Sequence, residues 1–178
     1  MSEEVNISVK PATMTDLKYI TYLANLNGRS IGFIPKVAYE SAIKGSKPSK
    51  NRWSDTCNDK IFMCYENATE NNPDPVGFVM MSYGKIAKVN QICIQEDARL
   101  LERGKALLSA ATDHGMKNGI YQFGCGCADD LESNLFWAAM GWDKVGQRKG
   151  IHFSNTWKES SDRIVNIYRY LISGLPFI

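Results

Sequence analysis

The stretch Val89–Leu108 reads VNQICIQEDARLLERGKALL, and the segment continues to Gly119. Its first six residues alternate, placing Val89, Gln91 and Cys93 on one face of an extended chain and Asn90, Ile92 and Ile94 on the other. Because both faces carry apolar side chains, this part is typical of a strand that is covered on both sides. From residue 100 the leucines and alanines recur with helical spacing, and Gly119 stands where a helix would end. The pattern predicts a strand, a short turn and a helix that begins near residues 99–104.

The start of the predicted helix suits an anion. A helix N-terminus carries a partial positive charge and backbone N–H groups without partners in the helix, and phosphate groups bind there. Gly104 lets the backbone approach a ligand closely, and Arg99, Arg103 and Lys105 add positive charge. The same unit is common in α/β proteins, so a purely structural role is the alternative interpretation.

These residues resemble the acyl-CoA-binding motif of the GNAT superfamily of N-acyltransferases. That motif has a strand ending in two branched apolar residues, a Gln or Arg five places later, two small residues in the next turn, and a pair of leucines. Ile92-Cys93-Ile94 matches the strand end, Arg99 the basic position, Gly104 the second small residue and Leu107-Leu108 the pair. Glu102 stands where the first glycine is expected, and its carboxylate would repel a pyrophosphate. A register shifted by two residues loses both the basic position and the strand spacing.

The resemblance implies a fold and an activity. The fold is α/β (α+β), with a central mixed β-sheet flanked by helices, in a single domain over residues 1–178. The activity is that of an acyl-CoA-dependent N-acyltransferase, which moves an acetyl group from acetyl-CoA (coenzyme A) to a small-molecule or macromolecular amine. The cofactor-binding residues that it implies are Ile92, Ile94, Arg99, Leu100, Leu101, Glu102, Arg103, Gly104, Lys105 and Asn134. The acceptor and the acyl group stay open, and a homodimer is compatible with the pattern.

The rest of the chain alternates between strand and helix patterns in an order that resembles the same fold. Extended patterns cover residues 7–10, 61–65, 76–83 and 120–127, and helical patterns cover 17–24, 37–43 and 129–140. The polar segment Asn67–Asp74 predicts an antiparallel hairpin between the second and third strands. The tail reads as a strand over 143–147, a polar segment over 148–161 and a strand over 163–171.

Two glycines interrupt the strand expected over residues 120–127. Glycine weakens a strand and often marks the close approach of another group. Gly124 and Gly126 therefore suit either the gap in which GNAT enzymes hold the pantetheine arm or a tight packing contact with a helix. Cys125 and Cys127 share one face, and no histidine is near them in the sequence, so they are interpreted as small buried residues rather than nucleophiles.

The catalytic residues cannot be assigned from the resemblance. The segment from Asn134 to Trp142 resembles a GNAT signature with an aromatic pair, whose second member is often a Tyr that protonates the leaving thiolate. Here that residue is Trp137, and an indole N–H is not an acid at neutral pH. The carboxylate often found on the strand before the motif is also missing, since Asn90 and Gln91 stand there. The remaining candidates are Tyr83, Asp130 and Glu132.

Composition limits the other classes of function. With 21 basic and 19 acidic residues, the net charge of +2 gives no overall nucleic-acid signal. No apolar run approaches the ~20 residues of a membrane span, and the first residues do not resemble a secretion signal. The five cysteines are irregularly spaced, so we expect no metal site and a reducing, cytoplasmic location.

Two basic segments keep other functions open. The loop Lys44–Lys60 carries five basic residues against two acidic ones, which suits either a nucleic-acid contact or a plain solvated surface. Near the end of the chain Arg148, Lys149, His152 and Trp157 are possible substrate contacts. The alternatives are a GNAT-fold enzyme that modifies a nucleic-acid base or nucleotide, and a non-catalytic GNAT-fold binding module.

Overall fold

The computed structural model describes residues 5–46, 58–67, 74–99, 101–153 and 158–172. The chain divides into two compact units, residues 1–120 and 121–178. The basic loop Lys44–Lys60 lies largely outside the described residues, as does Leu100. No helix in the described residues is long and apolar enough to cross a membrane.

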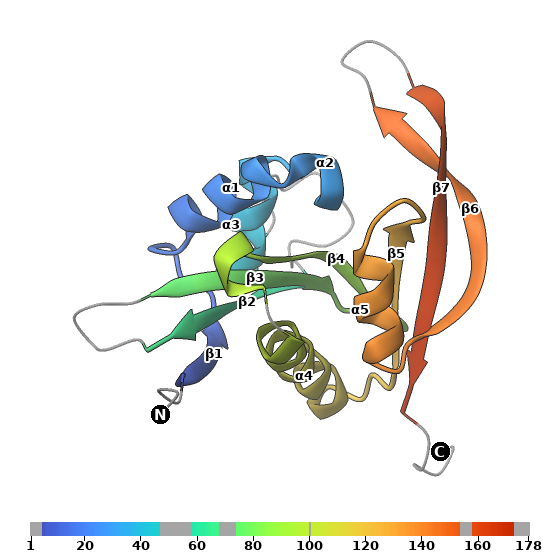
Figure 1. Ribbon diagram of the computed structural model, residues 1–178. Helices are drawn as coiled ribbons and strands as arrows, with labels where there is room; N and C mark the ends of the chain where they lie inside the picture. Colours follow the sequence, from blue (N-terminus) through green and yellow to red (C-terminus); the bar gives the residue numbers. More distant parts are fainter. Residues whose placement is uncertain (1–4, 47–57, 68–73, 100, 154–157, 173–178) are drawn as a thin grey trace. The chain divides into compact units, whose positions relative to one another are not determined.

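In its described residues, the first unit contains four strands and four helices. The strands are β1 (Ile7–Pro11), β2 (Asp59–Glu66), β3 (Pro75–Ser82) and β4 (Ala87–Ile94), paired antiparallel in that order (Figure 1). The helices are α1 (Leu17–Leu26), α2 (Gly28–Ile31), α3 (Lys36–Lys44) and α4 (Leu101–Lys117), and a short 3-10 turn, η1 (Glu96–Ala98), precedes α4. The predicted hairpin of β2 and β3 is confirmed. Helix α2 was not expected: the chain makes one more helical turn after Asn27 before it leaves at Gly32.

The two faces of these strands are covered by different helices. Buried apolar residues of α1 and α3 pack with one face of the strands, in a core that includes Ile20, Tyr39 and Phe78. Helix α4 covers the other face, where the His114 ring lies edge-on to Phe62 of β2 at 5.7 Å between centroids. Neighbouring residues of a strand point to opposite faces, so this alternation places α4 and the α1–α3 pair on opposite sides of the strands.

Strand β4 and helix α4 lie where the sequence predicts them, with two corrections. Val89 pairs with Met81 and Gln91 with Met80, so these two residues of β4 point to opposite faces and not to one face as expected. Val89, Gln91 and Cys93 are buried, but Asn90 is exposed and Ile92 and Ile94 are only half-buried, so the expectation of a strand covered on both faces is wrong for Asn90. The register with β3 shifts between the Met80–Gln91 and Met81–Val89 pairs, which leaves Asn90 as the extra residue of a β-bulge. A bulge turns the side chain of the extra residue away from its usual direction.

The second unit contains β5 (Gln122–Ala128), α5 (Ser133–Ala139), β6 (Asp143–Phe153) and β7 (Lys158–Leu171). The strands pair antiparallel in the order β5–β7–β6. Two expectations are corrected. Most of the polar segment 148–161 continues β6 and β7, because a two-stranded ribbon can keep polar side chains in solvent. Helix α5 starts at Ser133 rather than near Asp129, since the preceding carbonyl groups are bound by a side chain described below.

Candidate functional site

The link between β4 and α4 is held by hydrogen bonds to the end of α1. The Arg99 guanidinium folds back on the strand, with Nε donating to Ile94 O at 3.2 Å and Nη2 donating to Asn27 Oδ1 at 2.8 Å. Tyr19 donates from its hydroxyl to Gln95 Oε1 at 3.1 Å. The basic position of the motif therefore shapes the turn as well as adding charge next to it.

The first turn of α4 is attached to β2 by a buried ion pair. Arg103 donates from Nε to the Glu66 carboxylate, and the two side chains are only 8% and 15% exposed. Hydrogen bonding to Glu66 raises the pKa of Arg103. The positive charge of Arg103 is therefore matched inside the protein, and its side chain faces β2.

The remaining charges around this turn are of both signs. Arg99 and Lys105 are exposed cations, and Glu102 is an exposed carboxylate in the first turn. Gly104, in the same turn, is buried and has no side chain. The first four N–H groups of a helix have no acceptor within the helix, and they lie at its positive end. The two cations and these N–H groups attract an anion, whereas Glu102 and the exposed carboxylates Glu96 and Asp97 of η1 oppose one.

Strand β4 also fixes the chain that connects α2 with α3. The Gln91 side chain is buried; its Oε1 accepts from Tyr39 OH at 2.6 Å and its Nε2 donates to Gly32 O at 2.9 Å. Next to Gly32, the Phe33 side chain is 82% exposed. Gln91, which stands on the strand where the resemblance implies a carboxylate, therefore has a structural role. Sequence reasoning missed it, because a glutamine carries no signal of which partner it will find.

Each of the three catalytic candidates has its own surroundings. Tyr83 lies against the second half of α4, where its hydroxyl donates to Ala111 O at 2.7 Å, and burial raises its pKa. That hydroxyl holds the helix in place and is poorly suited to act as an acid. Asp130 pairs with Arg163 at 2.9 Å, and Glu132 is exposed just before α5.

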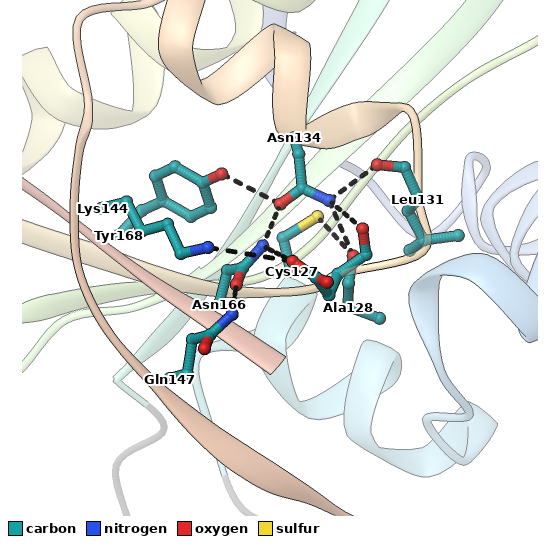
Figure 2. A network of polar contacts seen from close by, with 9 residues as sticks. Cys127, Ala128, Leu131, Asn134, Lys144, Gln147, Asn166 and Tyr168 are labelled. Atoms are coloured by element: carbon teal, nitrogen blue, oxygen red, sulfur yellow. Dashed lines mark hydrogen bonds and ion pairs between the residues drawn. The ribbon is translucent and has the colours of Figure 1, made fainter. Parts of the chain in front are cut away.

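Asn134 is the centre of a polar network in the second unit, shown in Figure 2. Its Nδ2 donates to the carbonyl oxygens of Ala128 at 2.8 Å and Leu131 at 2.7 Å, which delays the start of α5. Its Oδ1 accepts from Asn166 Nδ2 and from Tyr168 OH, each at 2.9 Å. The amide that the motif assigned to the cofactor is thus fully used inside the unit.

The same network extends across β6 and β7. Asn166 is 2% exposed; it also donates to Asp129 Oδ1 at 2.8 Å, and its own oxygen accepts from Gln147 at 2.8 Å (Figure 2). Lys144 lies 3.8 Å from the same Asp129 oxygen. Every donor and acceptor of the Asn166 amide is therefore satisfied, as a buried polar group requires.

The glycines of β5 are explained by packing within the unit. A Cβ on Gly124 would collide with the Arg169 guanidinium, and a Cβ on Gly126 would lie 3.0 Å from Val165 Cγ1. These contacts come from β7 and not from a helix, as the packing alternative had assumed. Cys125 and Cys127 are buried as expected, and burial raises the pKa of both thiols.

Comparison with known proteins identifies the class of fold. No protein-family model matches the sequence, and no curated protein sequence is significantly similar to it. Solved structures do match. NAA60 from Arabidopsis thaliana, in complex with a bisubstrate analogue, aligns with a TM-score of 0.74 and 11% identity, over 96% of this chain and 100% of that chain. The ribosomal-protein-S18-alanine N-acetyltransferase of Escherichia coli aligns with a TM-score of 0.66 and 13% identity, over 96% and 97%.

A third match is the acetyltransferase of Salmonella typhimurium that modifies the N-terminal serine of ribosomal protein L7/L12. It has a TM-score of 0.66 and 16% identity, over 96% of this chain and 100% of that chain. The chain therefore has the fold of the N-acetyltransferases. The mixed-sheet GNAT fold expected from the motif of β4 and α4 is confirmed.

Proposed function

We propose that the protein is an acyl-CoA-dependent N-acetyltransferase. The observation that carries the proposal is the segment from β4 to α4, because its residues match the acyl-CoA-binding motif and its first helical turn is arranged for an anion. The N-acetyltransferase fold supports it. NAA60 was solved with acetyl-CoA, which supports the same donor for this chain.

In this proposal the pyrophosphate of acetyl-CoA binds the N–H groups at the start of α4. Residues 101–104 supply that turn, Gly104 gives the close approach, and Arg99 and Lys105 supply charge. Arg103 contributes its backbone, because its guanidinium is paired with Glu66. Ile92 and Ile94 line the pantetheine arm along β4. We leave Asn134 out of the cofactor site, since its amide is used inside the second unit.

For this reaction the protein needs to position the amine and the thioester and to remove a proton from the amine. A neutral amine attacks the thioester carbonyl, and N–H groups of β4 between the bulge and Ile94 would polarise that carbonyl. The leaving thiolate of coenzyme A needs no strong acid, because a thiol titrates near pH 8.5. Trp137 in place of a tyrosine is compatible with this reaction.

The acceptor is an amine, and we propose a macromolecular one first. Two of the structural neighbours act on ribosomal proteins, which supports an N-terminal amine. The basic loop over residues 44–60 supports a nucleic-acid base or nucleotide as the second class. A cytoplasmic location agrees with the four buried free cysteines among the described residues. A homodimer remains part of the proposal.

The test is turnover with a defined acceptor panel. The protein is incubated with acetyl-CoA and, separately, peptides beginning with alanine or serine, a lysine peptide, spermidine, nucleosides and RNA. Thiol release and mass spectrometry of the acceptor are followed together. We expect one class to gain an acetyl group in step with thiol release. If acetyl-CoA binds but no member gains an acetyl group, the chain is a binding module and the enzymatic proposal is wrong.

A further inference from the structure

A chain of polar side chains crosses three neighbouring strands of the first unit. Ser82 on β3 donates from Oγ to Asp59 Oδ1 on β2 at 2.5 Å, and Asn90 on β4 donates from Nδ2 to the same Ser82 oxygen at 2.6 Å. Asp59 and Ser82 are half-buried, and Asn90 is exposed. The order β2–β3–β4 in Figure 1 is the order of this chain of contacts.

Asn90 joins the path from the bulged part of β4. Asp59 pairs directly with Ser82, and paired residues of an antiparallel sheet share a face. Ser82 in turn pairs with Lys88, so a regular strand would point Lys88 and its second neighbour along that face. Asn90 is that second neighbour; the register shift leaves it without a paired residue on β3, and its amide donates to the Ser82 oxygen.

The Ser82 oxygen keeps one acceptor position. A hydroxyl has one hydrogen and two lone pairs. The hydrogen is given to Asp59, and one lone pair accepts from Asn90. Among the described residues Ser82 Oγ has no second donor, so its second lone pair can accept a proton from a bound amine. The three residues thus form a path that ends on a carboxylate.

The reach of the acyl donor points to the same place, and this step rests on the proposed function. The pantetheine arm has about twelve bonds between the pyrophosphate oxygen and the sulfur, roughly the length of the main chain of four residues. An arm that enters at Ile94 and follows β4 backward therefore brings its thioester to Asn90. The carboxylate that is missing from β4 is supplied there from β2, through Ser82.

We propose that Ser82 is the catalytic residue that accepts the proton of the amine, and that Asp59 receives it through Ser82. The amine nitrogen forms a bond to the thioester carbonyl carbon, and the carbon–sulfur bond breaks, leaving the thiolate of coenzyme A. The amine proton moves to Ser82 Oγ while the hydroxyl hydrogen of Ser82 moves to Asp59. Asp59 then loses the proton to water, and the thiolate takes one from water.

Two lysines are neighbours of the path in the paired strands. Lys88 pairs with Ser82 across the strands and shares its face, and Lys60 follows Asp59 on β2. Lys60, as the next residue of the strand, points to the other face. Lys88 disfavours an ammonium ion on the face of Ser82, so the amine is expected to react from its neutral form.

The experiment is a pH–rate profile of Asp59→Asn, with a peptide beginning with alanine and with spermidine as the probe amines. Asparagine still accepts the Ser82 hydrogen bond through its own oxygen, so a structural role would survive the change, but it cannot take a proton. We expect kcat to fall about 100-fold at pH 7. The difference in kcat between the variant and the wild type should become smaller as the pH approaches the pKa of the amine. Ser82→Ala should show the same profile.

The control is Asp113→Asn, which removes an exposed carboxylate from α4 and should leave the profile unchanged. Acetyl-CoA affinity and thermal melting are measured for each variant. A wild-type profile for Asp59→Asn would overturn the proton path. So would wild-type protein that binds acetyl-CoA but releases no thiol with either probe. A failure to bind acetyl-CoA would instead overturn the proposed function itself, so the two failures are distinguishable.

Discussion

Glu102 places a carboxylate beside the N–H groups at the start of α4, and its two effects have opposite signs. The charge stabilises the helix through the helix dipole, and it repels a bound pyrophosphate. We predict that Glu102→Gln lowers the free energy of unfolding by about 0.3–1 kcal/mol and tightens acetyl-CoA binding by about two- to fivefold. Urea unfolding and calorimetric titration measure the two quantities. Asp113→Asn, on the same helix, is the control, and weaker binding by Glu102→Gln would contradict the placement of the pyrophosphate.

Asn134 separates a structural role from a cofactor role. Its Oδ1 satisfies donors of Asn166 and Tyr168, which are 2% and 5% exposed. Asn134→Ala leaves both donors without that acceptor, so we predict a loss of about 2–3 kcal/mol in the free energy of unfolding. Acetyl-CoA affinity should stay within about twofold, after correction for the folded fraction. A large loss of acetyl-CoA affinity in protein that is still fully folded would show that Asn134 belongs to the cofactor site.

At the scale of elements, a buried ion pair joins the first turn of α4 to β2. Removing one partner of such a pair leaves an uncompensated charge, whereas replacing both by apolar groups is often neutral. We predict that Arg103→Leu costs about 3 kcal/mol of unfolding free energy and that adding Glu66→Leu recovers most of it. A double-mutant cycle by urea unfolding tests this. Two losses that simply add would mean that the pair is not coupled.

Helix α4 also carries a pH-dependent contact. The His114 ring lies between Phe62 and Tyr83, at 5.7 and 4.9 Å between centroids. Burial, together with Lys60 and Lys117, lowers its pKa below the ordinary 6.5. The unfolded chain therefore binds the proton more readily than the folded one. Stability should be level above pH 6.5 and fall as the pH drops below it.

His114→Phe keeps the ring contacts and removes the titration. Its free energy of unfolding should lose this part of the pH dependence, measured by urea unfolding between pH 5 and pH 7.5. His152, the other histidine, is present in both proteins and cancels in the difference. An unchanged slope in the variant would show that His114 is not the group responsible.

For the whole molecule, periodicity in the sequence predicts most elements because each buries one regular face. Strands β2 to β4 and helix α4 follow directly from the spacing of apolar residues such as Val89, Cys93 and Leu107. The full length of the β6–β7 ribbon could not be predicted in this way, because polar residues on a solvated hairpin show no regular spacing of apolar residues. The first residue of α5 could not be predicted either, since the hydrogen bonds of one side chain, Asn134, determine where the helix begins.

The candidate site was predictable only where local geometry creates it. The first turn of α4 follows from the strand–turn–helix pattern, and its charges can be read from the chain. The pairing of Arg103 with Glu66 joins residues 37 positions apart. The contact of Tyr83 with Ala111 spans 28 positions. No local pattern encodes such contacts. The sequence therefore predicted that Arg103 binds the cofactor and that Tyr83 is a catalytic candidate, whereas in the structure both side chains bond α4 to its surroundings.

The most direct measurement of the central claim is calorimetric titration of the protein with acetyl-CoA, beside free coenzyme A and ATP. We predict one site that binds acetyl-CoA and coenzyme A with similar affinity and binds ATP much more weakly, because β4 contributes contacts to the pantetheine arm. At a hundred times the dissociation constant, acetyl-CoA should raise the free energy of unfolding by about 2.7 kcal/mol. No heat and no change in melting temperature at millimolar acetyl-CoA would contradict the account.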